Sequence, residues 1–315
     1  MKIKTVVLIV LCSGMVSFAT TALSEIRYST DNSAITFQNQ HIQIVLDKQL
    51  YAKVYYLDGQ KSLSINEDSH QGLSARPTFF LEADGTLYNN FKVESSTCSR
   101  YFTDPIYGAG RKLTITSHDK DIKQTLLLET YDRYPDVVLI QSQYLNEGKK
   151  PLKVNGIYCQ HYRLDRTLAN PAEVSYDFRH TNPIQDAWGH SYLNLPFTSD
   201  YSEDFLVPLG GYGRSGIPFI DIWGRKMGMA IFLVESTPRI IRIPCQVQPD
   251  GKVDIAIHLQ PAETRGQLPE IVPPGQKITS WKTAVCVHKG DYFDPARRFS
   301  QLLDGALTKA GRRGL

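Results

Sequence analysis

Apolar residues recur at every second position along most of this chain, and this period of two constrains the fold more than any other feature. Ile35 and Phe37 alternate with polar residues, and so do Ile42 and Ile44 after a short turn at 38–40. Such alternation places one side of a strand against a core and the other side toward solvent. The two runs therefore predict a β-hairpin.

The same pattern continues through most of the chain. A second hairpin is predicted between Thr78–Leu81 and Leu87, because Asp84-Gly85 supplies the positive φ angles of a tight β-turn. Polar turns separate the later β-branched and aromatic runs, so the strands are expected to pair antiparallel in an all-β fold. These predicted strands are Arg111–Ser117, Ile122–Tyr131, Val137–Leu145, Leu152–Leu164, Phe205–Pro208, Ile217–Trp223, Met227–Val234, Arg239–Val247, Val253–Leu259 and Ile278–Val287.

One helix is predicted, near the C-terminus. Asp294 is suited to cap it, and Pro295 fits its first turn. Apolar residues fall on one face at helical spacing: Phe299, Leu302, Leu303 and Ala306. Residues 307–315 are predicted to form a short basic tail.

A Pro- and Asn-rich stretch from Ala169 to Leu195 interrupts the alternation and predicts a long loop. Long loops in compact domains are usually functional or disordered, and the aromatic content here favours function. Aromatic faces stack on sugar rings, and polar side chains bind the hydroxyls. The candidate sugar-binding residues are Trp188, His190, Tyr192, Tyr212 and Arg214.

The alternative for each of these rings is an ordinary packing role in the core. Trp223 fits that alternative best, because it lies inside a predicted strand. Six other histidines are predicted to be surface residues or hydrogen-bonded polar residues: His41, His70, His118, His161, His258 and His288.

Motifs for other chemistry are weak or missing. Gly211–Gly216 matches the dinucleotide fingerprint G-x-G-x-x-G, but the strand-like run Ile217–Trp223 follows it where a helix is needed to hold the pyrophosphate. Ser215 lacks the second glycine of a hydrolase elbow, and no zinc-protease spacing is present. The sequence therefore predicts no cofactor, no metal and no assignable catalytic residue.

The first residues predict export. Lys2 and Lys4 precede an apolar run to Ala19 and a small-residue stretch ending at Ala22, as in a secretory signal peptide. We expect cleavage after about residue 22 and a secreted or periplasmic protein. The apolar run is shorter than the roughly 20 residues of a membrane span, so no membrane association is predicted.

The net charge bears on nucleic-acid binding, and the cysteine content bears on disulfide formation. The net charge of +3 includes Lys2 and Lys4, so the mature chain is nearly neutral, which disfavours nucleic acid as a partner. Four cysteines follow the signal peptide, without a C-x-x-C pair: Cys98, Cys159, Cys245 and Cys286. Disulfides and buried free thiols both remain open.

Three segments carry a resemblance to a known family. WGHSYLNLPFTSDYSEDFLVPLGGYGRSGIPFIDIWGRKMGMAIFLVESTPR (Trp188–Arg239) resembles the amino-terminal β-supersandwich of melibiase-type α-galactosidases, glycoside hydrolase family thirty-six. PPGQKITSWKTAVCVHKGDYFDPARRFSQLL (Pro273–Leu303) is similar to that family's closing strand and linker helix, and Tyr131–Val154 to a strand pair of related supersandwiches. The resemblance covers about half of the mature chain.

The resemblance implies an antiparallel β-supersandwich of the galactose-mutarotase-like class. It would occupy residues 23–292, and residues 293–315 would form the linker helix and basic tail. The family's two catalytic aspartates lie in a (β/α)₈ barrel of about 250 residues that follows this domain. Neither aspartate matches a position in this sequence, so we expect the polypeptide alone to be inactive.

Three functions follow as hypotheses. The first is a non-catalytic supersandwich that supports an α-galactosidase-like barrel in cis or in trans, with a large exposed apolar face for docking. The second is a free-standing carbohydrate-binding protein that uses the region from Trp188 to Arg214. The third is aldose epimerisation, which needs a histidine and a carboxylate in one cleft.

Overall fold

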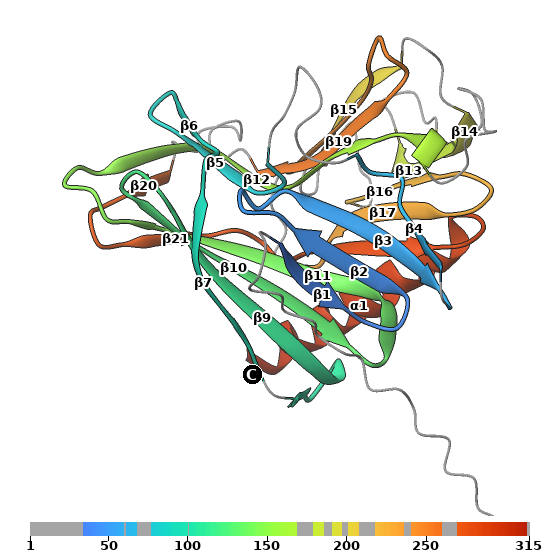
Figure 1. The fold of residues 1–315 in the computed structure, drawn as a ribbon, viewed down its shortest axis with the longest axis horizontal. Helices are drawn as coiled ribbons and strands as arrows, with labels where there is room; N and C mark the ends of the chain where they lie inside the picture. The colour runs from blue at the N-terminus through green and yellow to red at the C-terminus, as the bar shows by residue number, and fades with distance from the viewer. Residues whose placement is uncertain are drawn as a thin grey trace, which may run out of the picture.

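The computed structural model describes residues 34–59, 61–67, 77–99, 101–168, 179–185, 191–196, 201–207, 218–235, 241–259 and 270–313. In these residues the strands form three antiparallel sheets, accompanied by a 3₁₀ turn at Arg166–Leu168 and one α-helix (Figure 1). The predicted all-β class with a single C-terminal helix is confirmed. No helix in the described ranges is long and apolar enough to cross a bilayer.

The first hairpin belongs to a four-stranded sheet. Its strands follow chain order: β1 (Ile35–Gln38), β2 (Ile42–Leu46), β3 (Ala52–Asp58) and β4 (Lys61–Leu63). Ile35 lies opposite Leu46 and Phe37 opposite Ile44, so the predicted hairpin is confirmed. The apolar members of each pair face the core, because period-two alternation places them on one side of the sheet.

The second sheet has seven strands in the order β15-β18-β19-β12-β5-β6, and β20 also pairs with β12. Their bounds are β5 (Phe80–Ala83), β6 (Thr86–Tyr88), β12 (Leu152–Leu164), β15 (Ser202–Val207), β18 (Ile241–Val247), β19 (Val253–Leu259) and β20 (Glu270–Val272). Asp84 and Gly85 join β5 to β6 with φ angles of 50° and 70°. The Asp-Gly turn is therefore of the kind predicted.

The third sheet has eleven strands in the order β14-β13-β16-β17-β22-β11-β10-β9-β7, with β21 paired to β11 and β8 to β9. Their bounds are β7 (Lys92–Cys98), β8 (Phe102–Asp104), β9 (Gly108–Asp119), β10 (Ile122–Tyr131), β11 (Tyr134–Asn146), β13 (Arg179–Gln185), β14 (Ser191–Pro196), β16 (Phe219–Trp223), β17 (Gly228–Leu233), β21 (Lys277–Thr279) and β22 (Thr283–His288). The late strand β22 thus lies inside the sheet, between β17 and β11.

The long loop predicted at 169–195 is wrong in part, because this stretch contains β13 and most of β14. Pro183 had argued against a strand, since proline cannot donate to a sheet ladder. The strand accommodates it where the pairing with β14 shifts register, between Asn182 and Gln185. At such an irregularity a missing N–H costs little.

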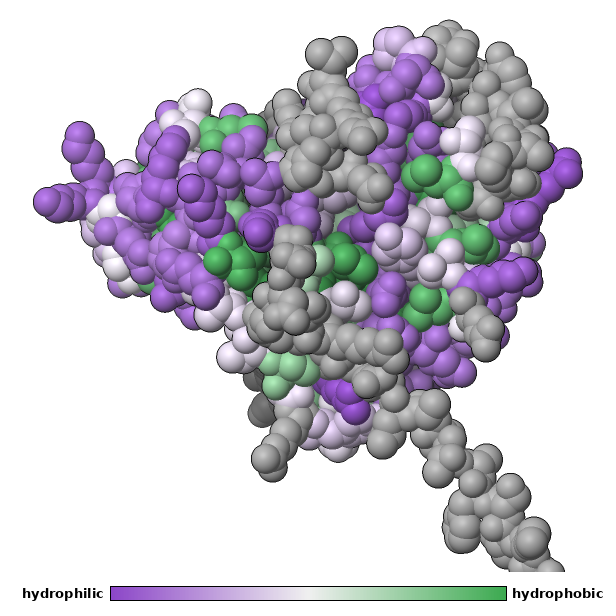
Figure 2. Space-filling model, in the orientation of Figure 1, coloured by the Kyte–Doolittle hydropathy of each residue, from purple (hydrophilic) through white to green (hydrophobic). Residues whose placement is uncertain are grey.

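The described surface does not show the wide apolar face expected for a docked barrel. Its exposed large apolar side chains are Tyr101, Leu168, Ile271, Phe293 and Leu307, which come from separate parts of the chain. Phe293 and Leu307 both belong to the helix, but 14 residues of helix separate them by about 21 Å. On the face in Figure 2, hydrophilic residues cover both ends of the molecule and hydrophobic residues form small patches between them.

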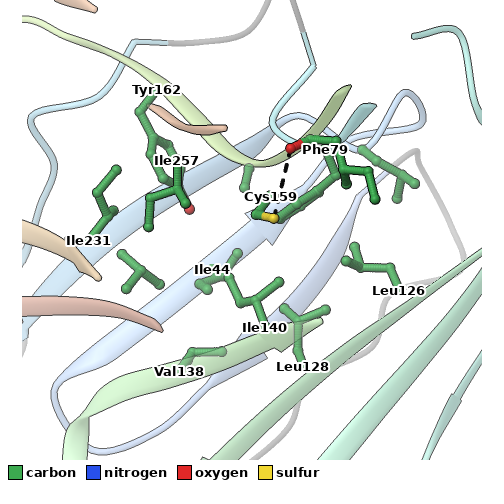
Figure 3. Close-up of a cluster of buried hydrophobic side chains, with 14 of the residues drawn as sticks. Ile44, Phe79, Leu126, Leu128, Val138, Ile140, Cys159, Tyr162, Ile231 and Ile257 are labelled. Atoms are coloured by element: carbon green, nitrogen blue, oxygen red, sulfur yellow. Dashed lines mark hydrogen bonds between the residues drawn. The ribbon is translucent and has the colours of Figure 1, made fainter. Parts of the chain in front are cut away.

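The main core fills the space between the two large sheets. Figure 3 shows Ile44 of the four-stranded sheet between Val138 and Ile140 of β11 on one side and Cys159 of β12 on the other. All four side chains are buried, as are their neighbours Phe79, Leu126, Leu128, Tyr162, Ile231 and Ile257. Each buried aliphatic side chain of this size contributes roughly 1.5–3 kcal/mol. The four-stranded sheet is therefore part of the core and not an appendage.

A second core lies on the outer face of the eleven-stranded sheet, where the helix α1 (Phe293–Arg313) packs (Figure 1). Phe299 contacts Phe219 and Phe232, with ring centroids 5.9 and 5.4 Å away. Leu302 is fully buried in the same cluster. The predicted inward helix face is confirmed.

The ends of the helix differ from the prediction. Asp294 lies inside the first turn and binds Arg297 at 3.0 Å, whereas Asp291, two residues before the helix, accepts the N–H of Phe293 at 3.1 Å. The basic tail predicted from residue 307 is also wrong, because the helix continues to Arg313. Leu303 and Ala306, the last residues of the predicted apolar stripe, pack on the cluster.

Candidate functional site

The predicted sugar-contacting residues fall largely outside the described part of the chain. Those outside are Trp188, His190, Tyr212 and Arg214, and the glycine-rich segment 211–216 lies there too. Tyr192 lies on β14, where its main chain pairs with Asn182 of β13. The sugar-contact assignment therefore stays a prediction.

Trp223 lies at the end of β16, two strands away from Tyr192. It is half-buried, and its indole Nε1 donates a hydrogen bond to Oγ1 of Thr181, at 3.3 Å, on the neighbouring strand β13. Trp223 therefore makes a polar contact in addition to the packing role predicted for it. Its polar edge helps to join β13 to β16.

A buried aspartate–histidine pair lies next to Trp223 and was not predicted. Nε2 of His288, the last residue of β22, is 2.9 Å from Oδ1 of Asp221 on β16. The side chains are 2% and 0% exposed. The two residues are 67 positions apart, so no local pattern in the sequence could indicate the contact.

A glycine of the intervening strand makes this contact geometrically feasible. Strand β17 lies between β16 and β22, and its Gly228 is the cross-strand partner of both Trp223 and His288. A Cβ on Gly228 would lie 2.1 Å from Nε2 of His288. The imidazole therefore passes over the bare backbone of Gly228 to reach Asp221.

Two opposing effects act on the proton of His288. Burial by itself lowers the pKa of this imidazole, because it penalises the charged form. The carboxylate of Asp221 acts in the other direction, both by its charge and by its hydrogen bond, and the resulting pKa is raised. Since water is nearly excluded from both side chains, the pair cannot contact a substrate from this position, and its chemistry is that of a structural contact.

A second grouping of histidine and carboxylates lies at the surface. Nδ1 of His118 on β9 is 2.6 Å from Glu94, and its Nε2 is 3.0 Å from Glu147. Exposed pairs of this kind contribute little to stability, about 0–1 kcal/mol. The epimerase hypothesis needs a histidine and a carboxylate facing one cleft; the His288 pair is sealed, and His118 belongs to a surface ion-pair cluster.

An aromatic row crosses the outer face of the seven-stranded sheet. Tyr158 of β12 stacks on Phe80 of β5 and on His258 of β19, with centroids 3.9 and 3.8 Å apart and planes within 13° of parallel. The register explains the row, because Tyr158 is the cross-strand partner of both rings. Gly156 leaves room for His258, since a Cβ there would lie 2.3 Å from Nε2.

This row differs from an open sugar platform. The ring of Tyr158 already stacks on Phe80 and on His258, Phe80 is fully buried and His258 is 5% exposed. Stacking on a sugar requires a free aromatic face. We therefore assign the row a packing role. His258 is buried, so the surface alternative predicted for this histidine is wrong.

The cysteines and metal-ligand residues show no further centre within the described ranges. Cys98 is exposed and Cys159, Cys245 and Cys286 are buried, and these four described cysteines lie outside disulfide bonds. In the part of the chain that the structure describes, no three His, Cys, Asp or Glu side chains group as metal ligands do.

Comparison with known proteins identifies the fold. No family model matches the sequence, and no curated protein matches it. Solved structures do match: the α-galactosidase from Lactobacillus brevis has a TM-score of 0.57 at 11% identity, over 84% of this chain and 41% of that one. The GH36 α-galactosidase AgaB from Geobacillus stearothermophilus gives 0.57 at 10% identity, over 85% and 41%.

The galactosidase domain of the α-galactosidase–sucrose kinase AgaSK is similar as well, with a TM-score of 0.58 at 9% identity over 84% of this chain and 42% of that one. The chain thus spans about two fifths of the length of these structures. The part that it matches is the amino-terminal region of the α-galactosidases. The predicted resemblance is therefore confirmed at the level of the fold: the described chain has the β-architecture of the amino-terminal region of GH36 α-galactosidases.

Proposed function

We propose that this chain is the non-catalytic β-supersandwich part of an exported α-galactosidase-like glycoside hydrolase, and that it supports a catalytic (β/α)₈ barrel in cis or in trans. The supporting observation is the fold likeness, which takes in more than four fifths of this chain but only about two fifths of each α-galactosidase. A (β/α)₈ barrel of about 250 residues accounts for chemistry that the matched part does not carry.

The position of α1 is consistent with a supporting role. The helix begins five residues after His288 and packs along the outer face of the eleven-stranded sheet. Arg298 on the helix forms an ion pair with Asp136 on β11 at 3.0 Å. Because these contacts fix the orientation of α1 on the sheet, the helix can set the direction of a barrel that follows it or packs on it.

Hydrolysis by the purified mature chain, residues 23–315, tests the non-catalytic role. We expect no release of nitrophenol from p-nitrophenyl α-galactoside, while the Lactobacillus brevis α-galactosidase in the same buffer turns over. Rates in the ordinary enzymatic range, about 1–10³ s⁻¹, would contradict the proposal.

The supporting role needs a separate test. The tagged chain, produced in its own host, is expected to co-purify with a glycosidase barrel, or to carry one in the same polypeptide, as seen by mass spectrometry. Exclusive recovery of the chain without such a barrel, in repeated purifications and after cross-linking, would argue against this role.

Carbohydrate binding is the second candidate. The edge hairpin β13–β14 supports it, because it places the strand with Tyr192 two strands from Trp223 in one sheet. Calorimetric titration with raffinose, the sugar bound in a Geobacillus stearothermophilus α-galactosidase, tests it. Binding that is lost in Trp188→Ala and kept in Tyr88→Ala would favour this function, and a flat titration of the unmodified chain would exclude raffinose-type binding.

A further inference from the structure

The aspartate–histidine pair occupies the junction between the sheet and the helix. His288 ends β22, and α1 starts at Phe293 after a connection of four residues. Because Asp221 is on β16, the contact spans three adjacent strands, with Gly228 of β17 beneath the imidazole. The side chain that ends the last strand before the helix is therefore fixed by a residue two strands away.

The pair depends on a single contact. Nδ1 of His288 and Oδ2 of Asp221 are both buried, and neither has a hydrogen-bond partner among the described residues. A buried carboxylate is costly unless a cation or several donors face it. For Asp221 the ionisable nitrogen in contact is that of His288.

Other charged groups surround the pair and do not replace this contact. Asp294 on α1 and Asp136 on β11 both act on His288 with negative charge, and Arg298 on α1 is engaged by Asp136 at 3.0 Å. Strand β13 contributes the hydroxyl of Thr181, which binds Trp223, and the exposed Arg179. The connection to the helix contributes Lys289, which lies 3.5 Å from Asp58, and Asp291, which accepts the N–H of Phe293.

We propose that the Asp221–His288 pair is a pH-dependent lock that holds the connection 289–292 and the first turns of α1 against the eleven-stranded sheet. The lock is closed while the imidazole carries a proton, since the ion pair is then neutral as a whole. When the proton leaves, a buried carboxylate faces an uncharged ring. Water then enters the junction, and the start of the helix loosens while the two-sheet core stays folded.

The direction of the pH effect follows from the proton balance. Burial opposes the protonated form, but the charge and hydrogen bond of Asp221 outweigh it, so the pKa of His288 is raised in the folded state. A raised folded-state pKa contributes stability below the ordinary histidine value near 6.5, and this contribution is lost as pH rises through the folded-state pKa. The lock therefore opens on the alkaline side.

Hydrogen–deuterium exchange of the intact chain between pH 6 and 9 tests the lock. After correction for intrinsic exchange, peptides covering 286–299 are expected to lose protection by roughly tenfold as pH rises, because the ion pair is lost although the neutral ring still donates from Nε2 to Asp221. Peptides of β10 serve as an internal reference and keep their protection. Protection of 286–299 that stays constant over this range would overturn the proposal.

Variants separate the lock from general alkaline loosening. His288→Gln keeps a donor near Asp221 but cannot titrate, and Asp221→Asn removes the charge, so both are expected to abolish the pH dependence at 286–299. His118→Gln, at the surface cluster, is expected to preserve it. Should either variant fold poorly, the nitrogen-15 signals of the His288 ring in the unmodified chain decide: titration that does not coincide with the loss of protection contradicts the lock.

Discussion

The hydroxyl of Tyr107 donates a hydrogen bond to the main-chain carbonyl of Leu302 across 3.2 Å, and so joins the turn before β9 to the middle of α1. Tyr107 is 2% exposed, and its ring contacts Tyr131 and Tyr134 at centroid distances of 5.2 and 6.3 Å. The helix approaches this ring closely because residue 305 is glycine. A Cβ there would lie 2.6 Å from the Cε1 atom of Tyr107.

Gly305→Ala is therefore expected to destabilise the protein, although the same change usually stabilises a helix by about 1 kcal/mol. Overpacking against a fixed ring costs roughly 1–3 kcal/mol, so the steric effect outweighs the helix propensity. Urea denaturation followed by circular dichroism measures the difference. Ser300→Ala, at an exposed position of the same helix, is the matched control and should be neutral or slightly stabilising.

Asn39 joins the first hairpin to the eleven-stranded sheet. Its Nδ2 donates to Oγ1 of Thr130 at 2.6 Å and to the carbonyls of Tyr131 and Tyr134 at 3.0 and 3.3 Å. Asn39→Asp would place a buried carboxylate against these carbonyl oxygens, and we expect a loss of about 3 kcal/mol or more in the free energy of unfolding. The same amide-to-acid change at the exposed Gln276 is the control, and equal effects at both positions would contradict this role for Asn39.

His180 predicts a loss of stability in mild acid. Burial lowers the pKa of this imidazole to about 4, so between pH 6.5 and 4 the unfolded chain binds a proton that the folded chain does not. Stability contributed by the neutral ring is thus present above pH 6.5 and falls toward pH 4, by roughly 3 kcal/mol. Unfolding free energies at pH 7, 5.5 and 4.5 measure this slope. His180→Gln should flatten it, and an unchanged slope would assign the acid loss to other groups.

The thiols predict selective labelling. Burial raises the pKa of the Cys159 thiol to about 12 and raises that of Cys286 as well, which suppresses the reactive thiolate. Cys98 is exposed, although partial burial raises its pKa too. In the folded chain of residues 23–315 we expect iodoacetamide to modify Cys98 alone at pH 8.5, and all four cysteines in 8 M urea, as measured by mass spectrometry of peptides. Rapid native modification of Cys159 would contradict its burial.

Alternation made much of the fold predictable. The bounds predicted for Ile122–Tyr131, Leu152–Leu164 and Val253–Leu259 coincide with β10, β12 and β19, because each strand has one face against the core along its whole length. Strand β7 was missed, since its exposed residues Lys92–Cys98 carry no apolar stripe. This strand forms because it pairs with β9, and such pairing leaves no period-two pattern in the sequence of the strand itself.

The polar contacts could not be predicted from short sequence segments, because they join residues that are far apart in the sequence. Asp221 and His288 meet only because β17 lies between their strands and has a glycine opposite the imidazole. The residues next to Asp221 and His288 in the sequence do not indicate that Gly228 will lie between them. Likewise the sequence left His258 as a surface residue or a hydrogen-bonded one, and only the register of β19 with β12 places it on Tyr158.

The interior position of β22 has a consequence for biosynthesis. A nascent chain that has emerged only as far as β17 and β11 presents two hydrogen-bonding edges that await one strand from much later in the sequence. Sheets that depend on pairing between distant segments fold slowly, and their unpaired strand edges can pair with other chains in the meantime. The two edges stay unpaired until residues 283–288 have been synthesised, so the largest sheet is completed late in folding.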